Sequence, residues 1–263
     1  MEPQLIVIAL ALAALVGVSL GLLGGGGSIL TVPILTYVLG MPPREAIAAS
    51  LFIVGATSAV SMIGHAKAGR VRWKTGLLFG IAGMAGAFAG GIVGGFIPGA
   101  ILMVLFAVMM IITATAMIRG RNNQATKNSD TEHKPALARI LLDGFLVGIA
   151  TGLVGAGGGF LIVPALNLLG GLPMAIAVGT SLLVITMKSF AGLSGYLFSV
   201  QLNWPIVLAF TATAIAGSFA GVALAGRVPE RALRKGFGIF VLVMGAFVLV
   251  QELPPLFASL TAA

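Results

Sequence analysis

The chain has 263 residues, of which 59% are hydrophobic and only 8% are charged. A soluble domain usually carries about 25% charged residues, so this composition predicts an integral membrane protein. It contains no cysteine, which excludes disulfides, thiolate metal sites and thiol catalysis. The net charge of +8 does not predict nucleic-acid binding, because the basic residues lie between apolar stretches, as in the cytoplasmic loops of membrane proteins.

Most of the sequence consists of apolar runs that approach the roughly 20 residues a helix needs to cross a bilayer. In chain order they lie near 5–23, 46–66, 75–97, 100–118, 140–154, 174–200, 205–226 and 236–251. Two shorter runs, 28–40 and 159–171, each follow a glycine cluster. The first run is too long for a signal peptide and follows an acidic start at Glu2, so we assign it to the mature membrane region.

The two halves of the chain are a repeat. A shift of 131 residues places GLLGGGGSILTVPIL over GLVGAGGGFLIVPAL and gives 28 identities in the 86 positions from 21 to 106. Composition alone would give on the order of 8. A polar stretch separates the halves, so we predict a first membrane repeat (1–119), a cytoplasmic linker (120–138) and a second membrane repeat (139–263).

The basic residues predict how the halves are oriented. They gather at 67–74, in the linker and at 227–235. All three clusters fall on the cytoplasmic side only if each glycine cluster is the tip of a helical hairpin, and both termini then lie outside. The predicted fold is therefore all-α, with two inverted repeats, each a glycine-tipped helical hairpin plus three transmembrane helices. Such repeats recur among secondary transporters.

The glycine clusters are the first candidates for a binding site. Glycine lets the backbone approach a ligand, and irregular backbone at membrane depth must be buried in protein or line a watery cavity. The helix predicted after each cluster would direct free N–H groups toward an anion. Tight packing at a hairpin bend is the structural alternative. The candidate residues are Gly24, Gly25, Gly26, Gly27, Ser28, Gly155, Gly157, Gly158 and Gly159.

Lys188 is the sharpest single candidate, because it lies near the middle of a predicted span and is too deep to reach an interface. Thr180 and Ser181 precede it by about two helical turns and share its face. A stripe that includes Ser50, Thr57 and Ser58 is the hydroxyl-bearing equivalent in the first half. The alternative is a lysine paired internally for structure alone.

Two further polar residues admit two interpretations each. Asn167 could line the cavity or bond a neighbouring helix. His65, whose repeat mate is Tyr196, is expected to be an interfacial anchor, with gating or proton handling as the alternative. We predict that the protein is not an enzyme, because the sequence contains no catalytic constellation, and we expect no cofactor and no metal site.

The glycine segments share the pattern GLxGxGGxxxxVP, and they are followed by AxxxSL in the first half and AxGTSL in the second. With the loop GHxxxGxV at 64–71, these motifs resemble the TauE/SafE family of sulfite exporter-like permeases across nearly the whole chain. The resemblance implies a bacterial or archaeal cytoplasmic-membrane carrier of small anions such as sulfite or organosulfonates. It places the family's paired glycine loops on the two clusters and its Thr-Ser pair on Thr180 and Ser181. The first half departs from that pair with Ala49 and Ser50.

The expected function is secondary transport of a small anion by alternating access, with a lipid bilayer as surroundings. No nucleotide-binding segment is recognisable, so a proton or sodium gradient is the expected energy source. A passive anion channel and a non-transporting membrane scaffold are the alternatives. The scaffold leaves Lys188 and the duplicated loops unexplained.

Overall fold

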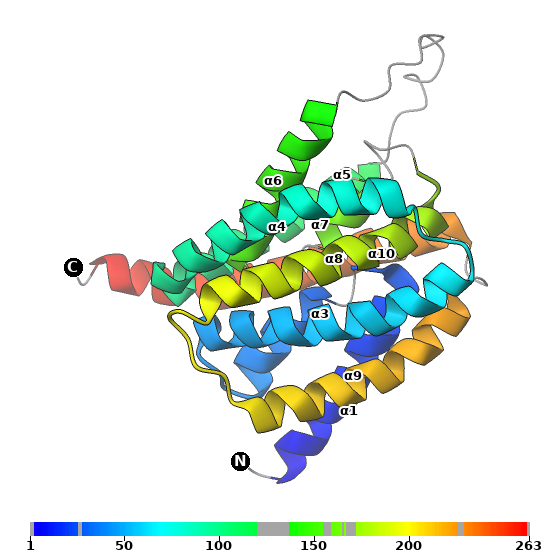
Figure 1. Cartoon of the computed structure of the whole chain (residues 1–263). Coiled ribbons are helices and arrows are strands. Elements are labelled where there is room, and N and C mark those ends of the chain that lie inside the picture. Colours follow the sequence, from blue (N-terminus) through cyan, green and yellow to red (C-terminus); the bar gives the residue numbers. More distant parts are fainter. Residues whose placement is uncertain are drawn as a thin grey trace.

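A computed structural model describes residues 3–25, 28–119, 137–154, 159–164, 166, 172–225 and 229–261, and this part of the chain is helical (Figure 1). The elements are α1 (Pro3–Leu23), α2 (Ser28–Pro33), a π-helical turn (Ile34–Val38), α3 (Pro43–Lys67), α4 (Trp73–Phe96), α5 (Gly99–Arg119), α6 (Leu137–Val154), α7 (Gly159–Pro164), α8 (Met174–Tyr196), α9 (Trp204–Leu224) and α10 (Glu230–Thr261).

Equivalent helices begin at equivalent positions of the two sequence halves. The first residues of α2 and α7, of α3 and α8, of α4 and α9, and of α5 and α10 are each 131 residues apart. Packing follows the same exchange: α4 lies against α6 and α8, whereas α9 lies against α1 and α3. Two pairs of equivalent helices, α3 with α8 and α5 with α10, also pack directly against each other.

The equivalent helices α3 and α8 run in opposite directions (Figure 1). Gly55, in the middle of α3, meets Ser189 in the second half of α8, whereas Arg70, just after α3, meets Gly179 near the start of α8. The pair α5 and α10 is antiparallel as well, because Gly238 lies against Ala114 and Gly245 against Met110. The polypeptide therefore folds the same sequence pattern twice, with opposite helix directions.

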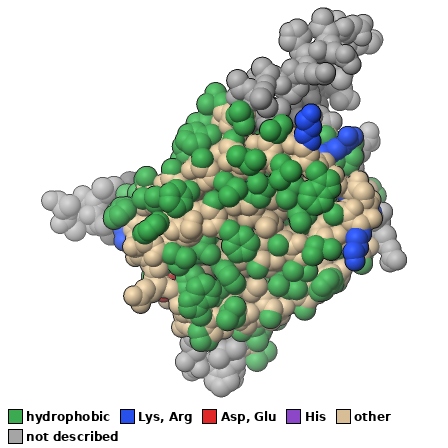
Figure 2. Space-filling view, viewed as in Figure 1, with side chains coloured by type: hydrophobic (Ala, Val, Ile, Leu, Met, Phe, Trp, Pro, Cys, Tyr) green, Lys and Arg blue, Asp and Glu red, His purple; other side chains and the backbone are tan. Residues whose placement is uncertain are grey.

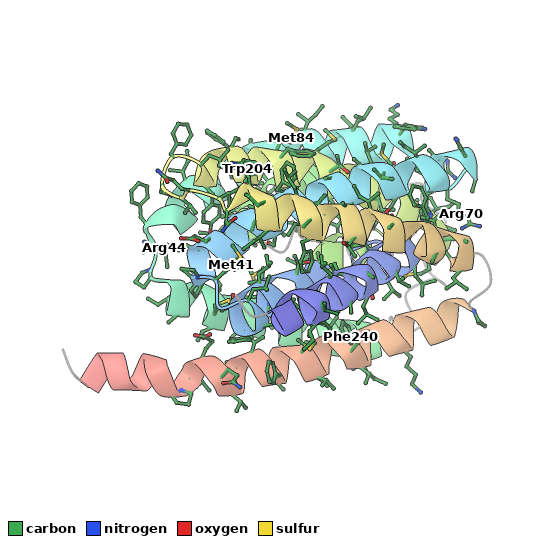
Figure 3. All side chains as sticks on the ribbon, turned by 90° about the horizontal axis from the view of Figure 1, so that it is seen from below. Met41, Arg44, Arg70, Met84, Trp204 and Phe240 are labelled. Carbon is green, nitrogen blue, oxygen red and sulfur yellow. The ribbon has the colours of Figure 1, made fainter. Side chains whose placement is uncertain are left out.

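The outer surface is apolar. Four helices in the described part, α3, α4, α8 and α9, are long and apolar enough to cross a membrane. Large hydrophobic side chains cover the face in Figure 2, and Ile81 is 60% exposed. Exposed apolar area on this scale marks a surface that faces lipid. Arg44 and Arg70 lie at opposite ends of the bundle (Figure 3).

The described helices differ from the predicted runs in three places. The run 28–40 is divided into α2 and the π-helical turn, whose last residue precedes the Leu39 N–H that donates to Ile34 O at 3.2 Å. Helix α8 ends at Tyr196, four residues before the predicted end, and α10 continues to Thr261 along one side of the bundle (Figure 3). The apolar pattern marked helix interiors but not their ends, where polar residues can still continue a helix.

Candidate functional site

The two glycine segments meet inside the bundle. A methyl group added at Gly25 would overlap the backbone of Gly159, and one added at Gly159 would overlap Gly25 and lie 2.7 Å from Ile185 Cδ1. The two halves therefore touch backbone to backbone, beside the middle of α8. Only glycine permits so close an approach.

Gly24 ends the first helix of its hairpin in a conformation that favours glycine. Its φ is +71°, in the left-handed region, and an added Cβ would lie 2.7 Å from Ser181 Oγ. The next helix, α2, begins at Ser28, whose Oγ donates to Gly25 O at 2.6 Å. Helices α2 and α7 have six residues each, so the helix dipole invoked from the sequence is carried by less than two turns.

Lys188 is 1% exposed, as predicted from its depth in the span. Its ammonium donates to Thr151 Oγ1 at 3.1 Å, near the carboxyl end of α6, and its stem packs against Gly83 of α4. Among the described residues Thr151 is its hydrogen-bond partner, and no carboxylate pairs with it. Carbonyl groups at a helix carboxyl end favour a nearby cation, so α6 partly compensates the charge.

The predicted hydroxyls divide into two groups. Thr180 Oγ1 accepts the Arg72 backbone N–H at 3.0 Å, and the Oγ atoms of Ser181 and Ser50 donate to Val178 O and Ile47 O. These three are engaged in holding loops and helices together. Thr57 and Ser58 are also fully buried, but their hydroxyls have no hydrogen-bond partner.

Sequence reasoning missed Ser189. It is fully buried, and its Oγ also has no partner. The signal was available, because Ser189 is the repeat mate of Ser58 at the same 131-residue offset, as Lys188 is of Thr57. Thr151, the partner of Lys188, gave no such signal because its own mate is Leu20.

His65 and Tyr196 form an equivalent pair of hydrogen bonds. His65 Nε2 lies 2.9 Å from Gly21 O at the end of α1, and Tyr196 OH donates to Leu153 O at the end of α6, at 2.6 Å. Each therefore ties a long helix to the helix before a glycine cluster. The interpretation of His65 as an interfacial anchor is wrong, because its side chain is only 1% exposed.

Glu252 was also missed, because the predicted run ends one residue before it. Helix α10 continues past this residue, and Glu252 is 8% exposed with its Oε1 accepting from Tyr37 OH at 2.8 Å. The bond links α10 to the π-helical turn of the first hairpin. The remaining candidates, Gly26, Gly27, Gly155, Gly157, Gly158 and Asn167, lie outside the described residues.

Relatives of the chain are known over its whole length. It is 35% identical to a probable membrane transporter protein of Xylella fastidiosa, with 100% of both chains covered. It is 32% identical to one from Methanocaldococcus jannaschii, covering 92% of this chain and 96% of the relative. The probable membrane transporter protein YunE of Bacillus subtilis is 29% identical, with 91% and 95% covered. No solved structure matches the chain.

These relatives and the long apolar helices define a multi-pass membrane protein of the transporter class, not an enzyme. The family model described as sulfite exporter TauE/SafE matches residues 9–248. The chain belongs to this family.

Proposed function

We propose that the chain is a secondary transporter that moves a small anion, sulfite or an organosulfonate, by alternating access between two inverted repeats. The observation that carries the proposal is Lys188, a cation buried in the protein with a hydroxyl as its partner among the described residues. A charge inside a membrane protein is costly and usually marks a substrate pathway. A bound anion would supply the missing negative charge.

The position of Lys188 supports a site between the halves. Ile185, about one helical turn earlier on α8, lies against Gly159 at the point where the two hairpins meet. Lys188 is therefore near the glycine contact, where backbone N–H groups would complete the coordination of an anion. The proposed site draws on Gly24, Gly25, Gly26, Gly27, Ser28, Ser50, Thr57, Ser58, Gly155, Gly157, Gly158, Gly159, Asn167, Thr180, Ser181 and Lys188.

Helix direction supports the inverted arrangement. If equivalent helices are related by an axis along the membrane normal, they run the same way; if the axis lies in the membrane plane, they run in opposite ways. The antiparallel contacts of α3 with α8 and of α5 with α10 favour the second arrangement. We propose repeats at 1–119 and 139–263, a cytoplasmic linker at 120–138, both termini outside, and residence in a bacterial or archaeal cytoplasmic membrane.

Transport assays in proteoliposomes test the function. The purified protein is reconstituted, and uptake of sulfite, sulfate, methanesulfonate, acetate and chloride is followed with and without a proton or sodium gradient. We expect saturable flux of sulfite or the sulfonate that one gradient accelerates. Flux that does not saturate and ignores both gradients would indicate a passive channel, and an absence of flux for every anion would reject transport of this class.

A further inference from the structure

We infer that Ser58 and Ser189 donate hydrogen bonds to the oxygen atoms of the transported anion. The inference rests on the proposed function and adds a residue, Ser189, to its site. It assigns the substrate to oxyanions, because two hydroxyl donors at fixed positions distinguish separate oxygen atoms from a spherical ion such as chloride.

The two hydroxyls are unpaired although each side chain is fully buried. Burying a hydroxyl without a partner costs about 1–3 kcal/mol by mutational estimates, and buried polar groups are normally satisfied. A serine or threonine in a helix can donate to a carbonyl of the preceding turn. Neighbours on the same two helices do so: Ser61 donates to Thr57 O at 2.8 Å and Thr186 to Leu182 O at 2.8 Å.

The repeat makes a coincidence improbable. Five buried side-chain atoms in the described part have no partner: Thr36 Oγ1, Thr57 Oγ1, Ser58 Oγ, His65 Nδ1 and Ser189 Oγ. Ser58 and Ser189 are the one pair among them that stands 131 residues apart. Both halves thus leave the same hydroxyl free at the same position, as expected if a ligand between them engages both.

Both serines lie where α3 and α8 cross. An added Cβ at Gly55 would be 3.1 Å from Ser189 Cβ, so the helices are in direct contact at this level. Ser58 follows Gly55 by three residues and shares its side of α3. Lys188 adjoins Ser189 in the chain, and Ile185 of α8 contacts Gly159. The crossing therefore joins the lysine, the two hydroxyls and the glycine contact.

The chemistry of this set suits a transported anion. Lys188 contributes one positive charge, which balances one negative charge of the substrate. The serines add neutral donors, which bind oxygen without the long-range attraction that would retain an anion. A hydrogen bond to a charged group contributes about 1.5–3 kcal/mol, equal to at least a tenfold change in Kd.

The first test compares Ser58→Ala, Ser189→Ala and the double variant with Ser194→Ala. Ser194 is an exposed residue of α8 whose Oγ bonds Ala191 O, so it is the matched control. Calorimetric titration of the purified protein with sulfite and with methanesulfonate gives Kd, and thermal unfolding without ligand gives Tm. We expect each site variant to raise Kd about tenfold or more. We expect Tm to stay equal or rise, because an unsatisfied buried hydroxyl has been removed.

Wild-type Kd in the double variant would overturn the inference, and so would a lower Tm with an unchanged Kd, which would show that the serines are structural. If the wild-type protein neither binds nor transports any anion of the panel, the proposed function itself fails. These two failures are separate, because the first requires a wild-type protein that binds.

A second measurement does not depend on the alanine variants. The chain has no cysteine, so Ser58→Cys and Ser189→Cys each introduce a single thiol. We expect sulfite-free methanesulfonate to slow the reaction of these thiols with a small membrane-permeant reagent at least fivefold, and Ser194→Cys to be unaffected. Equal rates with and without methanesulfonate at both positions, in a protein that binds it, would contradict the assignment.

Discussion

The two halves of the protein share one backbone plan but differ in the chemistry that they place on it. Position 57 is a threonine and its mate, position 188, is a lysine. Likewise His65 and Tyr196 occupy equivalent positions, and each hydrogen-bonds the end of the preceding hairpin helix. The glycine contact and the Ser58–Ser189 pair draw on both halves. Duplication thus determines where the site lies, and divergence determines its charge.

The orientation of the halves gives the largest expected effect, because labelling is all or none. Ala68 and Ser199 are equivalent exposed positions. If the repeats are inverted, a cysteine at Ser199 reacts with an impermeant reagent in intact cells, and a cysteine at Ala68 reacts only after permeabilisation. A cysteine at Asn128 in the linker should behave like the one at Ala68. Labelling of Ala68→Cys and Ser199→Cys from the same side would refute inversion.

Replacing the lysine should abolish transport. Lys188→Met keeps the length of the side chain and removes its charge, so we expect the transport rate at low substrate to fall about a hundredfold, the loss of roughly 3 kcal/mol from a charged hydrogen bond. Lys67→Met, at the end of α3, is the control and should transport normally. A folded Lys188→Met variant with wild-type rate and Km would show that the lysine is structural.

The glycine contact should be sensitive to a single methyl group. Gly25→Ala or Gly159→Ala would force the two hairpins apart and lower the free energy of unfolding by about 1–3 kcal/mol, as overpacking usually does. Gly236→Ala, in α10, has open space around it and should be neutral or stabilising by up to about 1 kcal/mol. Thermal unfolding in detergent measures both, and equal Tm values for all three variants would argue against the contact.

The hydrogen bonds at the hairpin ends should have the smallest effect. Tyr196→Phe removes the bond to Leu153 O and keeps the ring, so we expect a loss of about 1 kcal/mol in stability. His65→Phe should cost a similar amount by losing the bond to Gly21 O. Ser194→Ala serves as control on the exposed surface. A Tm unchanged in both variants would mean that neither bond holds its hairpin.

Much of the fold could be predicted because its causes are periodic or compositional. Apolar length marked the spans, the 131-residue repeat paired the elements, and the depth of Lys188 in its span indicated burial. The helical membrane fold is confirmed, whereas inversion and the substrate stay predictions. Partners of single side chains could not be predicted. Nothing in the sequence indicated that Lys188 would reach Thr151, or that Glu252 would bond Tyr37, because those contacts depend on how distant helices pack.

The Gly25–Gly159 contact also bears on how such a protein can diversify. The contact is made by main-chain atoms, which every substitution retains, and its one demand is that neither residue carries a side chain. The lateral surfaces of α3 and α8 are therefore free to change their polar groups without disturbing the joint between the halves. New substrate preferences can arise one residue at a time on a scaffold whose central fit depends on only two codons.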